Sequence, residues 1–377
     1  MPAGMDEVNY QARQNRLADA LQEPGLQGIV LNAGPSLTYL TGLHFHLSER
    51  PVVGMFSPGK TPIIVLPELE AGKLAGLSYP LQEFTYGERP EKWAEIFKAA
   101  LQTAGFEGKR VGIEPRCIRA LELSFLQSGN LEISFVPGDA SLEVIRIHKD
   151  EAEIEAMQKA VDIAQIALQS AIPLIKPGIT ESELAAEITI QLLRHGSNSQ
   201  LPFTPIVASG PNSANPHSFP GDRPLQEGDM LIIDWGANIG GYFSDLTRTF
   251  ALGEPGEEMK TIAHFVHQAN KAAREIAAPG VAAQEIDQAA RQVIEDAGYG
   301  QYFLHRTGHG LGLEGHEAPY IRDGNLQVLE QGMTFTIEPG IYIPGHGGVR
   351  IEDDVLITDQ RLHSFSDLPR ELQIIEI

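Results

Sequence analysis

Residues 6 to about 140 alternate short apolar runs with amphipathic stretches, a pattern typical of a small α/β domain. Runs rich in Val, Ile and Leu predict strands at residues 28–32, 52–56, 62–66 and 110–114. Residues 90–105 predict a helix between the last two strands, because their apolar side chains recur with helical spacing.

The pattern changes near residue 146, where a longer amphipathic helix is predicted over residues 146–175. Its apolar positions recur at 154, 157, 161, 164, 168 and 172, and Pro177-Gly178 ends it. We therefore predict two domains, residues 1–142 and residues 143–377.

The second domain contains an internal repeat. Residues 177–196 align with residues 279–298 at a constant offset of 102, and both segments begin with Pro-Gly and end with Gly. Thr180 and Glu183 have the spacing of a capping box, which predicts where the first repeated helix begins.

A pair of acidic residues follows each repeated helix. Each copy continues into an apolar run, at 227–237 and 330–340, in which a Gly lies six residues before an acid. A second strand in each copy carries another acid, so the set is Asp234, Asp245, Glu338 and Glu352. Folding two such hairpins about a pseudo-twofold axis would bring the four carboxylates together. Asp353 and Asp354 come next in the chain and are expected at the surface or behind this group.

Four carboxylates in a partly apolar pocket need protons or cations to neutralise them. Oxygen ligands with one histidine suit two divalent ions, and residues 305–319, HRTGHGLGLEGHEAP, should supply that histidine. His305 and His309 have the i,i+4 spacing of a helical metal motif. The four glycines in this segment argue against a helix, so we predict an extended segment instead.

Composition restricts the function further. Acidic residues outnumber basic ones by 50 to 28, for a net charge of −22, which argues against nucleic-acid and membrane binding. Cys117 is the single cysteine, so no disulfide can form within the chain, as expected in a reducing cytosol. The start lacks a signal-peptide pattern and no apolar run reaches about 18 residues. We therefore expect a soluble cytoplasmic protein.

The order Asp234, Asp245, His309, Glu338, Glu352 resembles the five metal ligands of the pita-bread metallopeptidases. That family includes Xaa-Pro dipeptidase (prolidase), aminopeptidase P and methionine aminopeptidase. The segments IIDWGANIGGYFSDLTRTF, GHGLGLEGHEAP, TIEPGIY and GGVRIEDD resemble its proline-specific branch, and LTYLTG extends the resemblance to the first half. The resemblance implies an α/β (α+β) fold: a small N-terminal α/β creatinase-like domain, then a C-terminal pita-bread domain with an internal pseudo-twofold repeat.

The resemblance implies a dinuclear metal site. Asp234 would chelate one ion, His309 and Glu338 would bind the other, and Asp245 and Glu352 would bridge both. Two Mn²⁺ ions are expected, with Co²⁺ or Zn²⁺ as alternatives. In the implied mechanism, a metal-bridging hydroxide attacks the Xaa-Pro peptide bond.

The resemblance also implies substrate contacts. His217 and His316 would contact the substrate and stabilise the tetrahedral intermediate, and Glu338 would pass a proton to the leaving proline nitrogen. The remaining pocket residues that it implies are His305, Tyr342 and Arg350, the last beside a bridging glutamate.

Glu49 and Arg50 are expected to contact substrate from the loop HFHLSERP, residues 44–51. This loop resembles one that closes over the partner subunit's site in compact bacterial prolidases, so a homodimer is expected. Ser48 stands where those enzymes tend to have His.

The predicted function is that of an Xaa-Pro dipeptidase acting on small peptides with proline second. The first alternative is aminopeptidase P activity on longer peptides, which differs in whether the far end of the pocket is closed. A creatinase-like hydrolase and a non-catalytic binding module are further alternatives, and the intact ligand set argues against both.

Overall fold

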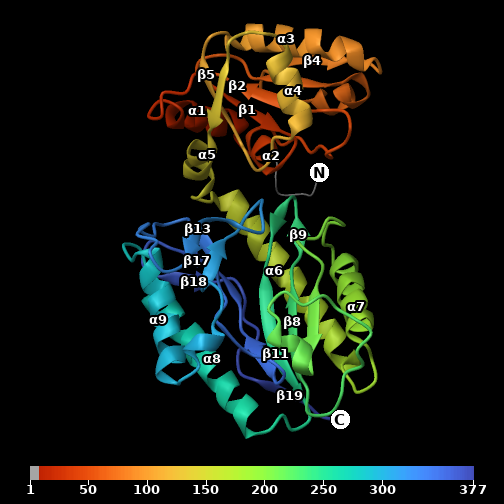
Figure 1. Cartoon of the computed structure of the whole chain (residues 1–377), viewed down its shortest axis with the longest axis vertical. Helices are drawn as coiled ribbons and strands as arrows, with labels where there is room; N and C mark the ends of the chain where they lie inside the picture. Colours follow the sequence, from red (N-terminus) through yellow and green to blue (C-terminus); the bar gives the residue numbers. More distant parts are fainter. Residues whose placement is uncertain (1–7) are drawn as a thin grey trace. The chain divides into compact units, whose positions relative to one another are not determined.

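The computed structural model describes residues 8–377, which form two compact units that meet in sequence between Arg146 and Ile147 (Figure 1). The first seven residues, part of the start that shows no signal-peptide pattern, lie outside the described range. The predicted boundary after residue 142 falls within helix α5 (Asp139–Arg146) and stays a prediction.

The N-terminal unit is a mixed α/β layer around one sheet. The sheet has the order β4-β3-β2-β1-β5-β6, formed by β1 (Ile29–Asn32), β2 (Val53–Phe56), β3 (Ile63–Pro67), β4 (Gln82–Tyr86), β5 (Arg110–Ile113) and β6 (Ser134–Pro137). The other helices are α1 (Tyr10–Ala20), α2 (Pro35–Thr41), α3 (Trp93–Ala104) and α4 (Ala120–Ser128). The four predicted strands and the predicted helix are confirmed. Their apolar side chains form one core, in which Phe97 and Val111 are fully buried.

Helix α6 (Glu151–Ala171) is shorter than the predicted span of 146–175. Asp150 begins it, because its carboxylate accepts a hydrogen bond from Glu153 N at 3.0 Å. At the other end the chain tightens into a 3₁₀ turn, Ile172–Leu174. This turn contains Pro173, which has no N–H to continue the helical ladder. The periodic apolar positions, 154–172, fit this helix closely, and the predicted span was too long because it ran past the cap at Asp150 and the turn at Pro173.

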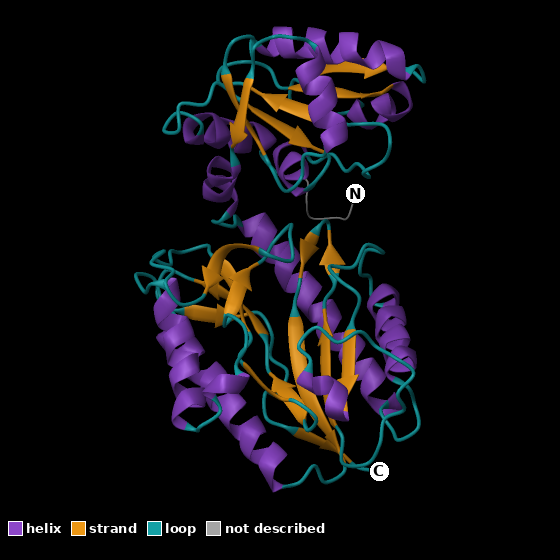
Figure 2. Ribbon diagram, viewed as in Figure 1, coloured by secondary structure: helices purple, strands orange, loops and turns teal. Residues whose placement is uncertain are grey.

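The C-terminal unit places strands between helices (Figure 2). Its helices are α6, α7 (Glu181–Arg194), α8 (Glu257–Ile276) and α9 (Ala283–Asp296). One sheet has the order β19-β11-β8-β7, from β7 (Ile206–Ser209), β8 (Met230–Trp235), β11 (Leu246–Leu252) and β19 (Gln373–Ile375). The other has the order β13-β12-β14-β17-β18, from β12 (Gly308–Gly310), β13 (Glu317–Ile321), β14 (Thr334–Ile337), β17 (Asp353–Ile357) and β18 (Leu362–Ser364). Two hairpins complete it: β9 (Asn238–Ile239) with β10 (Tyr242–Phe243), and β15 (Gly340–Ile343) with β16 (Gly347–Arg350).

The predicted repeat is confirmed in detail. Helices α7 and α9 begin and end at residues that differ by the predicted offset, and α6 packs on α7 as α8 packs on α9. The turns before the strands also correspond, since Gly228 and Gly332 have φ values of +87° and +88°. Such a backbone conformation favours glycine. The glycine that precedes the acid by six residues is therefore required in both copies for the same reason, a left-handed turn before the strand.

The two sheets are linked where the repeats meet. Thr247 and Glu352 form an isolated bridge, with Thr247 N donating to Glu352 O at 3.4 Å and Glu352 N to Thr247 O at 3.1 Å. On the outer face, the buried Trp235 fixes β8 to α6 by donating to Ala164 O at 2.8 Å. Among the described residues, no helix has the length and apolar character needed to cross a membrane.

The two copies differ at the N-cap, the residue directly before each repeated helix, which generates a stability prediction. Thr180 Oγ1 accepts from Glu183 N at 3.2 Å, whereas Ala282 at the equivalent position has no side-chain acceptor. Thr180→Ala should lower the free energy of unfolding by about 1 kcal/mol, and Ala282→Thr should raise it by a few tenths or more. Urea denaturation followed by circular dichroism measures both. A Thr180→Ala variant as stable as the parent would contradict the capping role.

Candidate metal centre

Four acidic side chains from the two repeats line one cavity of ≈ 740 Å³. Asp234 lies near the end of β8 and Asp245 directly precedes β11, while Glu338 directly follows β14 and Glu352 directly precedes β17. The positions correspond between repeats, as the sequence predicted. Strand alternation separates the two faces of β8: Ile233 is fully buried and is absent from the cavity lining, whereas Asp234 contributes to it.

His309 joins these acids from β12, and its segment is extended rather than helical. A Cβ on Gly308 would lie 1.8 Å from Thr336 O, and one on Gly310 would lie 2.2 Å from Ala318 O, so only glycine permits this close strand pairing. His309 Nδ1 lies 3.1 Å from Gly310 O, a contact that fits Nδ1–H as donor and leaves the Nε2 lone pair available. Nε2 lies 3.8 Å from Asp245 Oδ2 and 3.5 Å from Glu338 Oε1.

The other predicted candidate in this segment, His305, has both ring nitrogens engaged. Its Nδ1 lies 2.7 Å from Arg306 O and its Nε2 lies 2.9 Å from Tyr342 Oη. Burial, reinforced by the charge of Arg350, lowers the pKa of His305 to about 4, so the ring is neutral at pH 7. His305 is therefore a wall residue of the cavity, and its i,i+4 spacing to His309 does not create a helical metal site.

The electrostatics of the cavity fit divalent cations. Burial raises the pKa of Asp245 and of Glu352 well above the ordinary range, and each neighbouring carboxylate raises it further. Asp245, His309 and Glu352 each present a ligand atom within 4.8 Å of the others. Asp234 Oδ1 is buried and has no hydrogen-bond partner among the described residues. A cation would satisfy this oxygen and replace the protons that the crowded carboxylates otherwise need.

Arg350 organises one side of the cavity. Its Nη2 donates to Asp234 Oδ2 at 2.5 Å, its Nε to Thr247 Oγ1 at 3.0 Å, and its Nη1 to Tyr342 Oη at 3.1 Å. Nη1 also donates to Pro216 O at 3.2 Å, in the residue before His217. The guanidinium therefore links a carboxylate of the cavity to the loop that carries a predicted substrate histidine.

Part of the cavity lining is apolar, and sequence reasoning did not find it. His217 and His316 both line the cavity, and Arg306 Nη2 donates to His316 Nδ1 at 3.1 Å. The cavity lining also includes Phe203 and Phe219, the second of which is 86% exposed. These phenylalanines lie in irregular segments without periodicity, so their positions depend on tertiary structure. The wall as a whole comprises Pro202, Phe203, Thr204, Ile206, Pro216, Phe219 and Pro220.

Asp353 and Asp354 occupy one of the two locations expected for them, since neither lies at the surface. Both are fully buried, behind the residues that line the cavity. Asp353 pairs with Arg248 at 2.8 Å and with Arg370 at 2.7 Å, while Asp354 Oδ2 accepts from Asp245 N at 2.9 Å. Of the two locations expected from the sequence, the one behind the ligands is the one observed.

Glu49 and Arg50 belong to the N-terminal unit and are absent from the lining of this cavity. Arg50 lies between two acids, at 2.6 Å from Glu49 Oε1 and 3.0 Å from Glu88 Oε2. Their expected contact with substrate stays a prediction.

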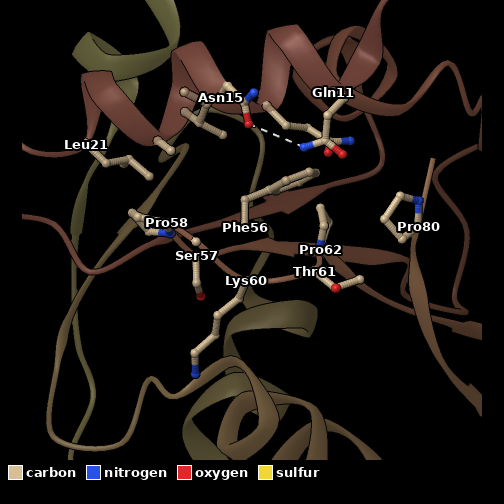
Figure 3. A pocket seen from close by; sticks show the side chains of 14 residues that line it. Gln11, Asn15, Leu21, Phe56, Ser57, Pro58, Lys60, Thr61, Pro62 and Pro80 are labelled. Atoms are coloured by element: carbon tan, nitrogen blue, oxygen red, sulfur yellow. Dashed lines mark hydrogen bonds between the residues drawn. The ribbon is translucent and has the colours of Figure 1, made fainter.

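A second cavity, of ≈ 320 Å³, lies in the N-terminal unit and offers different chemistry (Figure 3). Its described lining contains amide, hydroxyl and apolar side chains, including Gln11, Asn15 and Phe56, with no carboxylate or histidine. Lys60 points away from Gln11 and Asn15 (Figure 3), and its ammonium donates to Ala104 O at 2.9 Å. The metal chemistry expected of the sequence therefore belongs to the larger cavity.

Family models match both units of the chain. Residues 13–148 match the creatinase/prolidase N-terminal domain and residues 155–359 match metallopeptidase family M24. A probable dipeptidase PepE of Mycobacterium bovis is 37% identical, with 99% of this chain and 98% of that protein covered. An Xaa-Pro dipeptidase of Pyrococcus horikoshii is 35% identical, covering 98% of this chain and all of that protein.

The fold agrees as well. The crystal structure of recombinant prolidase from Thermococcus sibiricus has a TM-score of 0.92 at 34% identity, covering 98% of this chain and 100% of that chain. The two matched regions span nearly the whole sequence, and the two-unit fold is the one expected from the resemblance. The chain therefore belongs to metallopeptidase family M24 and carries the creatinase/prolidase N-terminal domain.

Proposed function

We propose that this metallopeptidase hydrolyses the Xaa-Pro bond of dipeptides, with two divalent cations held by Asp234, Asp245, His309, Glu338 and Glu352. One observation carries the proposal: the four carboxylates of the two repeats and His309 of β12 line one cavity that also has an apolar wall. The relatives named Xaa-Pro dipeptidase support the choice of substrate. A creatinase-like hydrolase or a pure binding module would have no use for this donor set.

The cations would supply Lewis acidity and a nucleophilic water near neutral pH. Asp245 and Glu352 would bridge the two ions, Asp234 would chelate one, and His309 with Glu338 would bind the other. Mn²⁺ is the proposed metal, because oxygen donors with one imidazole suit it, and Co²⁺ or Zn²⁺ are alternatives.

The remaining polar residues would act on the substrate. His217 and His316 would donate hydrogen bonds to the substrate and to the developing oxyanion, since both rings line the cavity. Glu338 Oε2 would hold the proton that goes to the leaving proline nitrogen; His305 Nδ1 lies 3.9 Å from this oxygen. Arg350 and Tyr342 would keep His305 in place, because Arg350 donates to Tyr342 Oη at 3.1 Å and Tyr342 Oη lies 2.9 Å from His305 Nε2.

Proline specificity has a physical basis in this cavity. The Xaa-Pro bond is a tertiary amide without an N–H, so a site that selects it must recognise the ring and the carbonyl instead. The apolar side chains that line the cavity from segments 202–206 and 216–220 would provide contact surface for a ring.

We also propose a cytoplasmic homodimer in which Glu49 and Arg50 approach the site of the partner subunit. The support is the resemblance of the loop at residues 44–51 to the closing loop of compact prolidases, together with the single cysteine. A cavity that is closed at its far end and binds the free carboxylate of the substrate would favour dipeptides over longer peptides.

Substrate length tests the proposed function. The Mn²⁺-loaded enzyme should hydrolyse an Xaa-Pro dipeptide and leave an Xaa-Pro-Yaa tripeptide largely intact, because a closed pocket excludes the third residue. Release of proline or of the first residue is measured by chromatography. Cleavage of the tripeptide alone would replace the dipeptidase assignment with aminopeptidase P activity.

Removing one bridging carboxylate should remove activity. Asp245→Ala or Glu352→Ala should reduce kcat by more than about a hundredfold, since even residues behind metal ligands commonly cost roughly 10–100-fold. Glu258→Gln, at an exposed acid on α8, is the matched control and should keep parental kcat. Near-normal turnover in either bridging variant at saturating Mn²⁺ would refute its assignment.

The buried acids also make the stability of the metal-free protein depend on pH. Burial raises the pKa of Glu338 from 4.5 to about 7, so the folded state retains a proton that the unfolded state releases. The stability that protonated Glu338 contributes is therefore fully present below about pH 4.5 and is lost as the pH rises through about 7. The Tm of metal-free protein should fall from pH 5 to pH 8 (about the window of this titration), and Mn²⁺ should reduce the fall. A metal-free Tm that rises across this range would contradict the prediction.

A further inference from the structure

A buried ion pair lies directly behind the carboxylates of the cavity and has no part in the mechanism above. Arg248 on β11 and Asp353 on β17 are 2% and 0% exposed, and neither lines the cavity. Arg248 Nη2 donates to Asp353 Oδ1 at 2.8 Å. The pair therefore joins the strand that follows Asp245 to the strand that follows Glu352.

Arg248 also donates hydrogen bonds to the backbone where the two repeats meet. Its Nη1 donates to Thr247 O at 2.8 Å and to Glu352 O at 2.7 Å. These are the same two residues that form the isolated bridge between the sheets. Thr247 Oγ1 additionally donates to Glu352 Oε2 at 2.7 Å, so the bridge fixes the side chain of a proposed ligand as well as its backbone.

Asp353 connects this junction to three further segments. Its Oδ1 accepts from Ser366 Oγ at 2.5 Å, and its Oδ2 accepts from Arg370 Nε at 2.7 Å. Asn270 Nδ2, on α8, donates both to Asp353 Oδ2 at 3.2 Å and to Ile337 O at 3.1 Å. Ile337 is the last residue of β14 and directly precedes Glu338. The hydrogen-bond network behind the cavity therefore also reaches the backbone next to Glu338.

We infer that Arg248 and Asp353 are positioning residues that hold the carboxylates of the two repeats at the separation needed for metal binding. The inference rests on the proposed function in one respect, that these carboxylates bind divalent cations. We call the pair the Arg248–Asp353 clamp. Without it, the bridge between Thr247 and Glu352 would keep only its two backbone bonds and one hydroxyl bond.

The clamp is better explained by positioning than by stability. A buried ion pair is often replaceable by apolar residues of similar volume without loss of stability, so its presence alone is weak evidence for a stabilising role. Here the charged pair satisfies peptide carbonyls on both strands, which apolar side chains cannot do. Residues that orient metal ligands in this way commonly affect metal affinity by roughly 10–100-fold.

Arg248→Lys is the sharpest variant, because it keeps the charge and removes the planar fork. Two nitrogens of Arg248 each make two hydrogen bonds, to Thr247 O and Glu352 O and to Asp353 Oδ1 and Leu368 O. One lysine ammonium cannot span these positions. Arg119→Lys is the matched control: it makes the same substitution in another arginine–carboxylate pair, with the buried Glu122 of the N-terminal unit.

The experiment measures Mn²⁺ affinity by isothermal titration calorimetry on metal-stripped full-length protein, and the visible absorption spectrum after Co²⁺ loading. Arg248→Lys should bind Mn²⁺ about 10–100-fold more weakly and show a changed Co²⁺ spectrum. Arg119→Lys should match the parent in both measurements. Parental affinity and spectrum in a folded Arg248→Lys variant would overturn the inference, whatever its Tm.

Arg370→Lys keeps the test decisive if Arg248→Lys does not fold. Arg370, whose side chain is 17% exposed, donates to Asp353 Oδ2 through Nε and to Ser364 Oγ and Ser366 O through Nη2. Lysine keeps the positive charge at this partly exposed position, so folding should survive. The substitution should weaken Mn²⁺ binding in the same direction by a smaller factor, and unchanged affinity in this variant would then overturn the inference. If the parent protein itself binds no divalent ion, the proposed function fails instead, so the two failures are distinct.

Discussion

The crowding of four carboxylates in one cavity is the constraint on which the rest of this structure depends. Burial raises the pKa of each, and for Asp245, Glu338 and Glu352 neighbouring acids raise it further. Ionised carboxylates at such separations repel one another, so the group is stable only with protons or cations present. The architecture keeps these side chains together against that repulsion by placing each at the end of a paired strand, where the backbone fixes its position.

Duplication explains how the chain meets this constraint, and divergence explains why the site is not symmetric. The repeated glycine turns and helices put equivalent acids on β8 and β14, and on the approaches to β11 and β17. β7 and β12 also correspond, at the offset of the repeated helices, but the second copy carries His309 where the first has Val207. The second copy therefore contributes the imidazole of His309, while the segments on both sides of β7 in the first copy contribute His217 and the apolar wall.

The acids and the repeat were predictable because they depend on local chemistry. A left-handed glycine, an apolar strand and an acid at fixed spacing have the same consequence wherever they occur. The start of α6 and the apolar wall were not predictable in the same way. The first depends on a single cap, Asp150, and the second depends on two separate loops, which carry Phe203 and Phe219, lining the same cavity. Tertiary contacts, not periodicity, decide such positions.

The consecutive residues Glu352 and Asp353 show most clearly where sequence reasoning ends. Both are buried carboxylates, so desolvation favours the neutral form of each. Arg248 and Arg370 nevertheless hold the pKa of Asp353 below its ordinary value, whereas the neighbouring acids and burial hold the pKa of Glu352 well above it. Arg248 is 105 residues away in the chain from Asp353, so nothing local separates the two acids. The folded chain itself supplies the cations that neutralise Asp353, whereas our proposal assigns the neutralisation of Glu352 to a bound ion.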